Sequence, residues 1–283
     1  MKKIILIQAH KDLECINDLI NQLDYENFEI YLHIDAKSTI NINEVHPKAR
    51  IVKNRININW GEFSQVEATL SSLKQINEEQ TDYSHIILIS GQDFPLKSNR
   101  EIDEFLNLNL NENYIQYFLI PKEGKFANYQ WRYTRRHYPK NEKFLRKINN
   151  VLIRMGIFNI DGRKLLPNYK YYSGSQWWIL TKDAIEYVLK ESTPKMLNYF
   201  KYVFCSDEMY FQILLLNSDK KFSITNDTLK FMKWEEFNHP KDLDINELDE
   251  IFNSPKNLFC RKISKGKSDL LRVKIKNRIN HLS

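Results

Sequence analysis

The chain has 283 residues, of which 42% are hydrophobic and 28% charged, and its formal net charge is +6. This composition is typical of a globular protein with one large or two small domains, and it excludes a disordered chain. A charge of this size does not indicate nucleic-acid binding, so we expect no nucleic-acid partner.

The cysteines and the first residues bear on location. Cys15, Cys205 and Cys260 are far apart and lack metal-binding spacing, which favours buried thiols in a reducing compartment. The opening residues MKKIILIQAH contain an apolar run that is too short for a signal peptide. Nothing approaches the roughly 20 apolar residues of a membrane span. We therefore expect a cytoplasmic protein.

The first 120 residues alternate between strand and helix patterns. Apolar runs predict strands at 3–10, 28–35, 83–93 and 113–120, with a shorter one at 49–54. Helices are predicted at 13–23, 64–79 and 100–108, the second with Ser64 as N-cap and Glu67 completing a capping box. This alternation predicts an α/β protein with a Rossmann-like, mostly parallel sheet that binds ligands at the carboxyl ends of its strands.

Segment 121–172 changes character, because it mixes aromatic residues and arginines without a clear period. Long loops in compact domains are functional or disordered, and the aromatic content argues against disorder. We interpret this segment as an irregular excursion from a single domain, residues 1–262. Beyond it, the patterns predict a strand at 175–181, a helix from Lys182, a helix within 202–216 and a strand at 228–234.

The basic tail, residues 263–283, is a predicted terminal helix. From Cys260 onward the chain has eight Lys or Arg against the single Asp269. A solvated helix explains this, and the alternative is a surface that attracts phosphates or anionic lipid. If the tail attracts anionic lipid, we expect the protein to make peripheral contact with the inner face of a membrane.

Polar residues lie where predicted strands end: His10, His33, Asp35 and Asp93. In an open α/β sheet that edge is the ligand crevice, so a nucleotide or substrate site is expected there. No GxGxxG follows the first strand and no GxxxxGK[ST] occurs, which disfavours dinucleotide oxidoreductases and P-loop enzymes.

Phosphate could be neutralised by a metal or by fixed cations. The one Asp-x-Asp pattern, Asp242–Asp244, lies in a polar segment that favours a loop or a helix cap. Lys230, Arg261 and Lys262 could neutralise phosphate without a metal.

Two adjacent carboxylates, Asp207 and Glu208, follow Ser206 in the apolar stretch YVFCSDEMYFQILLL. Carboxylates in the first turn of a helix ordinarily favour its dipole. A metal site or a catalytic base are the other interpretations.

Six blocks of the sequence occur in the order found in a known family: WGEFSQVEATL, LISGQDFPLKSN, YYSGSQWWILT, CSDEMYFQILL, LKFMKW and LFCRKI. Nearly the whole chain, residues 3–262, thereby resembles the core-2/I-branching glycosyltransferases, which include β-1,6-N-acetylglucosaminyltransferases, peptide xylosyltransferases and bacterial members. The chain departs from the family pattern at Cys260 and Ile263, and at Lys230, where Arg is frequent.

The resemblance implies a GT-A fold, a UDP-linked sugar donor (GlcNAc or xylose), inversion at the anomeric carbon and no divalent metal or other cofactor. It implies that Glu208 is the general base, and that Lys230 and Lys262, with Arg261 beside them, hold the leaving diphosphate. The other residues expected near the nucleotide sugar are His10, His33, Asp35, Trp60, Gly61 and Asp93. Those expected near the acceptor are Trp131, Arg132, Arg135, Ser175, Trp177 and Asp207.

The leading hypothesis is a bacterial-type inverting transferase that acts on a glycan or lipid-linked oligosaccharide in surface polysaccharide or lipooligosaccharide synthesis. Two alternatives stay open. One is a metal-dependent GT-A enzyme that uses Asp93 or Asp35, and the other is a non-catalytic glycan- or nucleotide-binding module.

Overall fold

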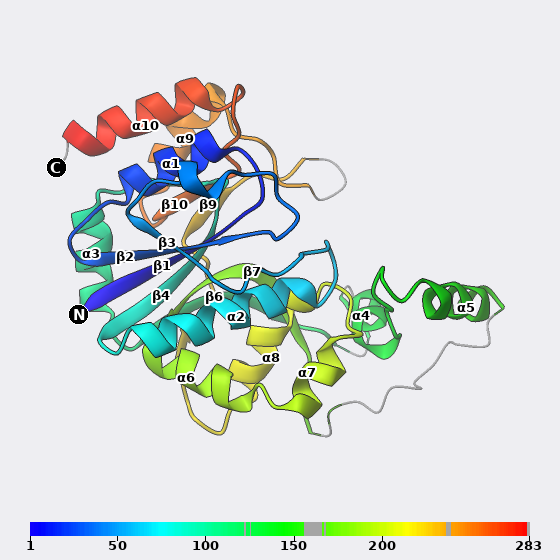
Figure 1. Ribbon diagram of the computed structural model, residues 1–283. Helices are drawn as coiled ribbons and strands as arrows, with labels where there is room; N and C mark the ends of the chain where they lie inside the picture. Colours follow the sequence, from blue (N-terminus) through cyan, green and yellow to red (C-terminus); the bar gives the residue numbers. More distant parts are fainter. Residues whose placement is uncertain (122, 125, 156–165, 167, 236–238, 282–283) are drawn as a thin grey trace.

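The computed structural model describes residues 1–121, 123–124, 126–155, 166, 168–235 and 239–281 (Figure 1). The strands are β1 Lys2–Ala9, β2 Phe28–Ile34, β3 Ala49–Ile51, β4 Tyr83–Ser90, β5 Asp93–Pro95, β6 Glu112–Leu119, β7 Tyr172–Thr181, β8 Ser223–Thr225, β9 Lys230–Met232 and β10 Phe259–Arg261. The α-helices are α1 Leu13–Gln22, α2 Ser64–Glu79, α3 Asn99–Leu108, α4 Trp131–Thr134, α5 Lys143–Arg154, α6 Lys182–Glu191, α7 Pro194–Phe200, α8 Tyr210–Leu216, α9 Leu248–Phe252 and α10 Asp269–His281.

The described residues form two sheets. The central one has seven strands in the order β3-β2-β1-β4-β7-β6-β8, and the small one has the order β5-β10-β9. In the central sheet β7 is antiparallel to both β4 and β6, and the other pairs are parallel. The predicted α/β class with a mostly parallel sheet is confirmed. The position of β7 between β4 and β6 and its antiparallel direction were not predicted, because an apolar run reveals neither the neighbours of a strand nor its direction.

The central sheet is covered on both faces, as Figure 1 shows. Ile4 and Leu6 of β1 pack with residues of α2, α6 and α8, whereas Ile5 and Ile7 pack with residues of α1, α3 and α10. All four side chains are fully buried. Burial of each such side chain contributes about 1.5–3 kcal/mol. Strands buried on both faces are therefore continuous apolar runs, which made them visible in the sequence.

The start of α2 differs from the prediction. The N-cap position is Phe63, and no side chain caps the helix there. The Ser64 hydroxyl instead accepts the backbone N–H of Asn59 at 2.8 Å. The capping box predicted for Ser64 and Glu67 is therefore wrong, because the hydroxyl is used to hold the preceding loop.

The helix predicted within 202–216 is broken. A 3-10 helix, Ser206–Glu208, comes first, Met209 leaves helical geometry with φ −132°, and α8 follows. Cys205 has the left-handed φ of 48°, and its N–H donates to the Gly61 carbonyl at 3.0 Å. The distant loop thus holds the residue before the first helical piece, and the helix that the apolar pattern predicts is divided at Met209.

Segment 121–172 is more regular than predicted in its described part, because it contains α4 and the 12-residue α5. Figure 1 shows α5 extending away from the body of the molecule. The predicted basic tail is the helix α10, and its Leu271, Ile275 and Ile279 are buried.

Two histidines are buried within strands of the central sheet, His33 in β2 and His85 in β4. His33 of β2 is fully buried, and its Nε2 accepts the N–H of Ile56 at 3.0 Å. Burial lowers the pKa of His33 to about 4, and burial likewise lowers that of His85 to about 4. A proton on Nε2 of His33 would remove the acceptor that the Ile56 N–H requires.

We expect the free energy of unfolding to fall as the pH drops from 6.5 towards 4. The unfolded histidine, with its ordinary pKa of about 6.5, then binds a proton that the folded one does not, at a cost of up to about 3 kcal/mol for His33. In His33→Gln, the free energy of unfolding measured by urea denaturation should depend less on pH between 6.5 and 4 than it does in the parent. The exposed His239, changed to Gln, is the matched control and should keep the parent profile. An unchanged slope in His33→Gln would contradict the assignment.

Candidate active site

A buried carboxylate, Asp93, joins the small sheet to the central one. Its Oδ2 accepts the Nζ of Lys230 at 2.5 Å, and its Oδ1 accepts Nη1 of Arg261 at 3.1 Å. The N–H of Ser90, the last residue of β4, also donates to Oδ2 at 3.1 Å. Because β10 pairs Arg261 directly with Asp93 and runs beside β9, three distant segments of the chain converge here.

Trp177 of β7 lies against the same two cations. The centre of its ring system is 4.6 Å from Nζ of Lys230 and 4.8 Å from Cζ of Arg261, which are cation–π distances. The next residue, Trp178, is 1% exposed and packs on Phe211. The two neighbouring side chains point to opposite faces of β7, as successive residues of a strand do. Trp177, which the sequence assigned to the acceptor, lies with residues assigned to the diphosphate.

The two cations differ in access. Burial lowers the pKa of Lys230 to about 8, and the Asp93 carboxylate opposes this shift. The Lys230 side chain is 3% exposed, whereas that of Arg261 is 14% exposed. Arg261 therefore reaches further towards a ligand, and its planar guanidinium suits phosphate oxygens.

Lys262 points to a neighbouring place. Its Nζ is 3.6 Å from Oδ1 of Asp242. Burial and Lys11 lower the pKa of His10, and Lys262 contributes in the same direction. His10 and Lys262 thus lie near each other after β1, beside the Asp93 cluster rather than in it.

Two residues predicted for the nucleotide side hold a loop. Oδ1 of Asp35 accepts the N–H groups of Lys37 at 3.0 Å and Ile58 at 3.3 Å. His33 holds Ile56 in the same loop. Since both side chains are almost fully buried, they shape the loop that leads to Trp60.

Four rings, which we call the aromatic group, gather at the end of that loop. Phe204 is at the centre, with ring centroids at 5.6 Å to Trp60, 4.9 Å to Trp131 and 5.3 Å to His137. Trp60 is 77% exposed and Trp131 37%. Gly61 has φ of +75°, and a Cβ there would be 3.0 Å from the Phe204 ring, so a glycine is required.

Glu208 is held by an arginine. Oε2 of Glu208 accepts Nη1 of Arg132 at 2.6 Å, and the same nitrogen is 3.2 Å from the Ser173 hydroxyl. The Arg132 guanidinium lies 4.6 Å above the ring of Tyr129. The side chain of Glu208 is 37% exposed and that of Arg132 14%. Arg132, which the sequence assigned to the acceptor, therefore orients a carboxylate that remains accessible.

The backbone fixes this pair as well. The N–H of Phe204 donates to the Arg132 carbonyl at 2.9 Å, and Cys205 is bonded to Gly61. The loop before Glu208 is thus attached both to α4 and to the loop that carries Trp60.

Asp207 differs from its neighbour in environment. Burial, followed by the nearby Glu208 carboxylate, raises the pKa of Asp207. Within the described part of the chain, no donor meets its Oδ1. The ion pair with Arg132 belongs to Glu208, so the two carboxylates have different roles.

Strand β7 links the two polar clusters. Ser173 contacts Arg132, and Trp177 contacts Lys230 and Arg261. Four residues of a strand span about 13 Å. The cation cluster and the pair of Arg132 and Glu208 are therefore both joined to this one strand.

Comparisons with known proteins identify the family of this chain. The family model described as Core-2/I-Branching enzyme matches residues 6–256. The chain belongs to the Core-2/I-Branching enzyme family. The mostly parallel sheet with helices on both faces then confirms the predicted GT-A fold.

Its relatives are distant and longer. Xylosyltransferase 2 of Mus musculus is 23% identical over 81% of this chain and 26% of its own length. A β-1,3-galactosyl-O-glycosyl-glycoprotein β-1,6-N-acetylglucosaminyltransferase of Bos taurus is 23% identical over 71% of this chain and 45% of its own length. Among solved structures, the glycosyltransferase GlyE of Streptococcus pneumoniae TIGR4 has 11% identity and a TM-score of 0.41, over 98% of this chain and 60% of that one. The chain thus spans a quarter to under a half of these two curated relatives.

Two more residues that the sequence assigned to the acceptor in this Core-2/I-Branching protein make local contacts. Arg135 directly follows α4, and its N–H donates to the Trp131 carbonyl at 3.4 Å. The Ser175 hydroxyl accepts the Trp177 N–H at 3.1 Å, a local contact. The sequence did not single out Phe204, the centre of the aromatic group, because one ring in an apolar stretch carries no distinguishing signal.

Gln8 was also missed. Its Oε1 accepts Nε2 of Gln176 at 3.0 Å and of Gln65 at 3.2 Å, and its Nε2 donates to Thr69 at 2.8 Å. It ties β1 to α2 and β7 near the carboxyl ends of the strands. A polar residue inside the run KIILIQA was the available signal.

Acidic residues elsewhere have structural roles. Asp244 caps a short 3-10 helix, as the capping interpretation of Asp242–Asp244 predicted. No three His, Cys, Asp or Glu side chains within the described ranges form a group that could hold a metal ion. The described helices include none that is both long and apolar enough to cross a bilayer.

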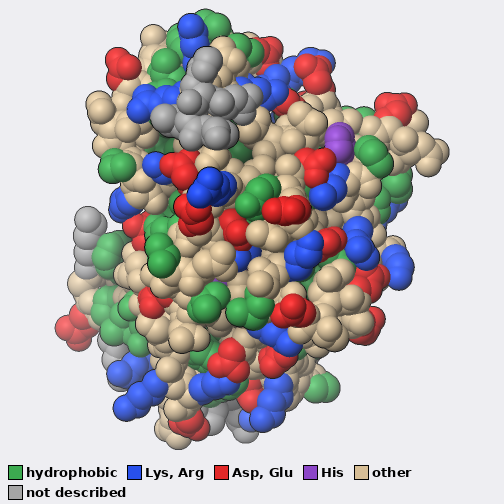
Figure 2. Space-filling model, turned by 90° about the vertical axis from the view of Figure 1, so that its left-hand side faces the viewer, with side chains coloured by type: hydrophobic (Ala, Val, Ile, Leu, Met, Phe, Trp, Pro, Cys, Tyr) green, Lys and Arg blue, Asp and Glu red, His purple; other side chains and the backbone are tan. Residues whose placement is uncertain are grey.

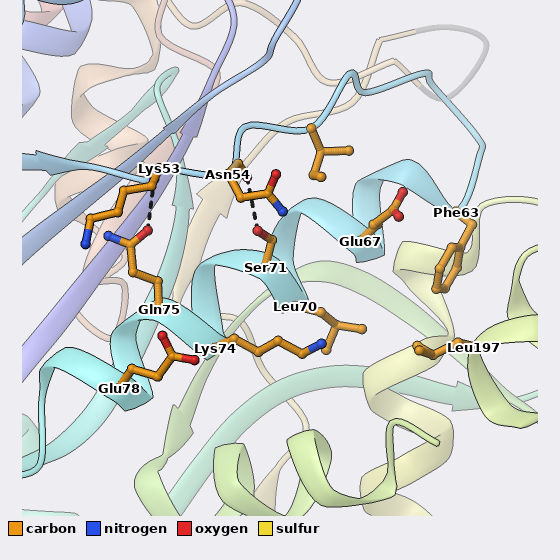
Figure 3. Close-up of a pocket in the computed structure, with 11 residues that line it drawn as sticks. Lys53, Asn54, Phe63, Glu67, Leu70, Ser71, Lys74, Gln75, Glu78 and Leu197 are labelled. Atoms are coloured by element: carbon orange, nitrogen blue, oxygen red, sulfur yellow. Dashed lines mark hydrogen bonds between the residues drawn. The ribbon is translucent and has the colours of Figure 1, made fainter. Parts of the chain in front are cut away.

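A separate hollow lies on the flank of α2. Its volume is about 430 Å³, and Figure 3 shows it between the loop at Lys53 and Asn54, the helix α2 and Leu197 of α7. The Ser71 hydroxyl donates to the Asn54 carbonyl, and Gln75 accepts the Lys53 N–H. Because its lining includes none of the residues that the sequence assigned to the donor or the acceptor, this hollow is not our candidate site.

We expect Asp93→Asn to lower the free energy of unfolding by about 3 kcal/mol, because Lys230 loses the charge that compensates for its burial. Urea denaturation at pH 7 measures this. Asp183→Asn, in an exposed pair with Lys220, is the control and should leave the midpoint nearly unchanged. A neutral outcome for Asp93→Asn would show that the cluster does not stabilise the fold.

Proposed function

We propose that this protein is a glycosyltransferase that moves a sugar, GlcNAc or xylose, from a UDP-sugar to a glycan hydroxyl with inversion. The observation that carries the proposal is the accessible Glu208 carboxylate, held by Arg132, which is joined to the same strand as the Lys230 and Arg261 cations. The relatives named above support the class of reaction, since their names describe xylosyl and N-acetylglucosaminyl transfer.

In the proposed reaction, the acceptor hydroxyl attacks the anomeric carbon while the bond from that carbon to the diphosphate oxygen breaks. Glu208 takes the hydroxyl proton as general base. Arg132 keeps its carboxylate oriented, and the loop contacts to Gly61 and Arg132 fix its backbone. A positioned base of this kind contributes about 10²–10⁴-fold to the rate.

The leaving diphosphate gains negative charge, which preorganised cations stabilise. We assign this role to Arg261 first, with Lys230 and Lys262 supporting it. Asp93 then acts as the anchor that orients the cations. Its carboxylate is committed to Lys230 and Arg261, and that of Asp35 to backbone N–H groups, which supports transfer without a divalent metal.

The acceptor would lie over Trp60 and Trp131. Exposed indole faces suit the apolar faces of sugar rings, and these two flank the loop that carries Glu208. We propose a glycan or lipid-linked oligosaccharide acceptor in surface polysaccharide or lipooligosaccharide synthesis, at the inner face of a bacterial-type membrane.

Glu208→Gln should lower kcat by about 10²–10⁴-fold, because the amide cannot take the proton. Its affinity for UDP, measured by calorimetry, should stay within about 2-fold of the parent, since the cation cluster is untouched. Glu186→Gln, at an exposed carboxylate of α6, is the control and should keep full activity. Wild-type kcat in Glu208→Gln would disprove the base assignment.

Turnover of a panel of UDP-sugars should be the same with and without excess EDTA, because fixed cations replace the metal. UDP release measured with UDP-GlcNAc and UDP-xylose first would identify the donor. A rate that EDTA abolishes and Mn²⁺ restores would instead favour the metal-dependent alternative. UDP-sugar binding without turnover of any donor would favour a binding module.

A further inference from the structure

The helix α5 exposes its apolar face. Its apolar side chains recur at helical spacing on one side, and basic ones lie on the other. The apolar set is Phe144, Leu145, Ile148, Val151 and Leu152, followed by Met155 just after the helix. Phe144 is 74% exposed, Val151 53% and Met155 64%, and no residue of α5 is buried.

The contrast with α10 shows how unusual this is within the molecule. The predicted basic tail packs its Leu271, Ile275 and Ile279 into the core. Its Arg272 and Lys276 both pair with Asp18 of α1. Three apolar residues of α10 are therefore covered by the protein, although Leu270 and Val273 are exposed, whereas no residue of α5 is buried.

The charge around α5 has one sign. The helix contains Lys143, Arg146, Lys147 and Arg154 and no acidic residue. Residues 131–155 include eight Lys or Arg against Glu142 alone, and Glu142 is paired with Lys201. In contrast, the face shown in Figure 2, turned away from α5, mixes acidic and basic side chains.

Hydrogen bonds connect α5 and the residues before it to the candidate active site. Nδ2 of Asn149 donates to the Arg136 carbonyl at 3.1 Å. The N–H of Lys140 donates to Oε1 of Glu62 at 2.8 Å, directly after Trp60 and Gly61. The chain enters α5 from α4, which supplies Arg132. The helix α5 is thus on the side of the molecule where Glu208 and the aromatic group lie.

We propose that α5 is a docking helix for an anionic lipid bilayer. Its apolar side chains enter the boundary between headgroups and acyl chains, and its Lys and Arg side chains extend to the lipid phosphates. Each basic residue near an anionic surface strengthens binding by on the order of 5-fold. A lipid-linked acceptor belongs to the proposed function. The docking of α5 on a bilayer is inferred from the exposed side chains of α5 and does not require that acceptor.

A second copy of the chain fits this surface less well. Pairing two α5 helices through their apolar faces would bring eight basic residues together without an acidic one from either helix. The contact would also be only about 18 Å long, which is short for a stable interface. Anionic headgroups complement the charge that a second copy would repel.

The test is co-sedimentation of the full chain, without donor or acceptor, with vesicles of equal parts phosphatidylglycerol and phosphatidylcholine. We expect binding that weakens with salt and is at least about 10-fold weaker to pure phosphatidylcholine. Phe144→Glu with Val151→Glu should reduce binding by at least about 10-fold. Leu108→Glu, at an apolar residue of α3 that is 86% exposed, is the control and should bind as the parent does.

The basic side chains are tested in the same assay. Arg146→Gln with Lys147→Gln should weaken binding to the anionic vesicles by about 10-fold or more and reduce its salt dependence. Lys190→Gln with Lys195→Gln, on α6 and α7, is the matched control.

No binding to anionic vesicles, or equal binding of the α5 variants and the parent, would overturn the proposal. A dimer in light scattering that Phe144→Glu dissociates would assign the surface to a second copy. The vesicle assay does not depend on turnover. A protein that binds the vesicles but shows no UDP release with any donor would therefore refute the proposed activity and leave the docking helix supported.

Discussion

The site depends on the buried carboxylate of Asp93. It holds Lys230 and Arg261 at 2.5 and 3.1 Å and receives the Ser90 N–H at the end of β4. A buried ammonium group without such a partner would be costly, so this one carboxylate allows two cations to lie at the edge of an apolar sheet. The small sheet supplies all three charged side chains, and Trp177 of the central sheet completes their surroundings.

A second set of contacts governs Glu208. His33 and Asp35 hold the loop that leads to Trp60 and Gly61, and Gly61 in turn bonds the backbone before Glu208. Arg132 completes the arrangement from the opposite side. The buried side chains of His33 and Asp35 are thereby connected, through the loop that they hold, to the backbone before the proposed base.

Much of the fold could be predicted, because its central strands are buried on both faces and the helices have regular apolar faces. The errors occurred where a contact from elsewhere overrides a local preference. Ser64 bonds Asn59 rather than capping α2, and the Gly61 carbonyl bonds Cys205 just before a helix that is divided at Met209. In α5 the helical period was present, but the aromatic and arginine-rich residues before it concealed it.

By itself, the sequence determined the α/β class, the family and which residues have chemistry suited to the reaction. It could not determine their partners, since the members of each pair are far apart in the chain: 76 residues for Arg132 and Glu208, 137 for Asp93 and Lys230, and 168 for Asp93 and Arg261. Local periodicity records which face of an element is buried, whereas these pairings depend on how strands and loops pack. The tertiary structure therefore made Arg132 the partner of Glu208, Asp93 the anchor of the cations, and α5 an open apolar face.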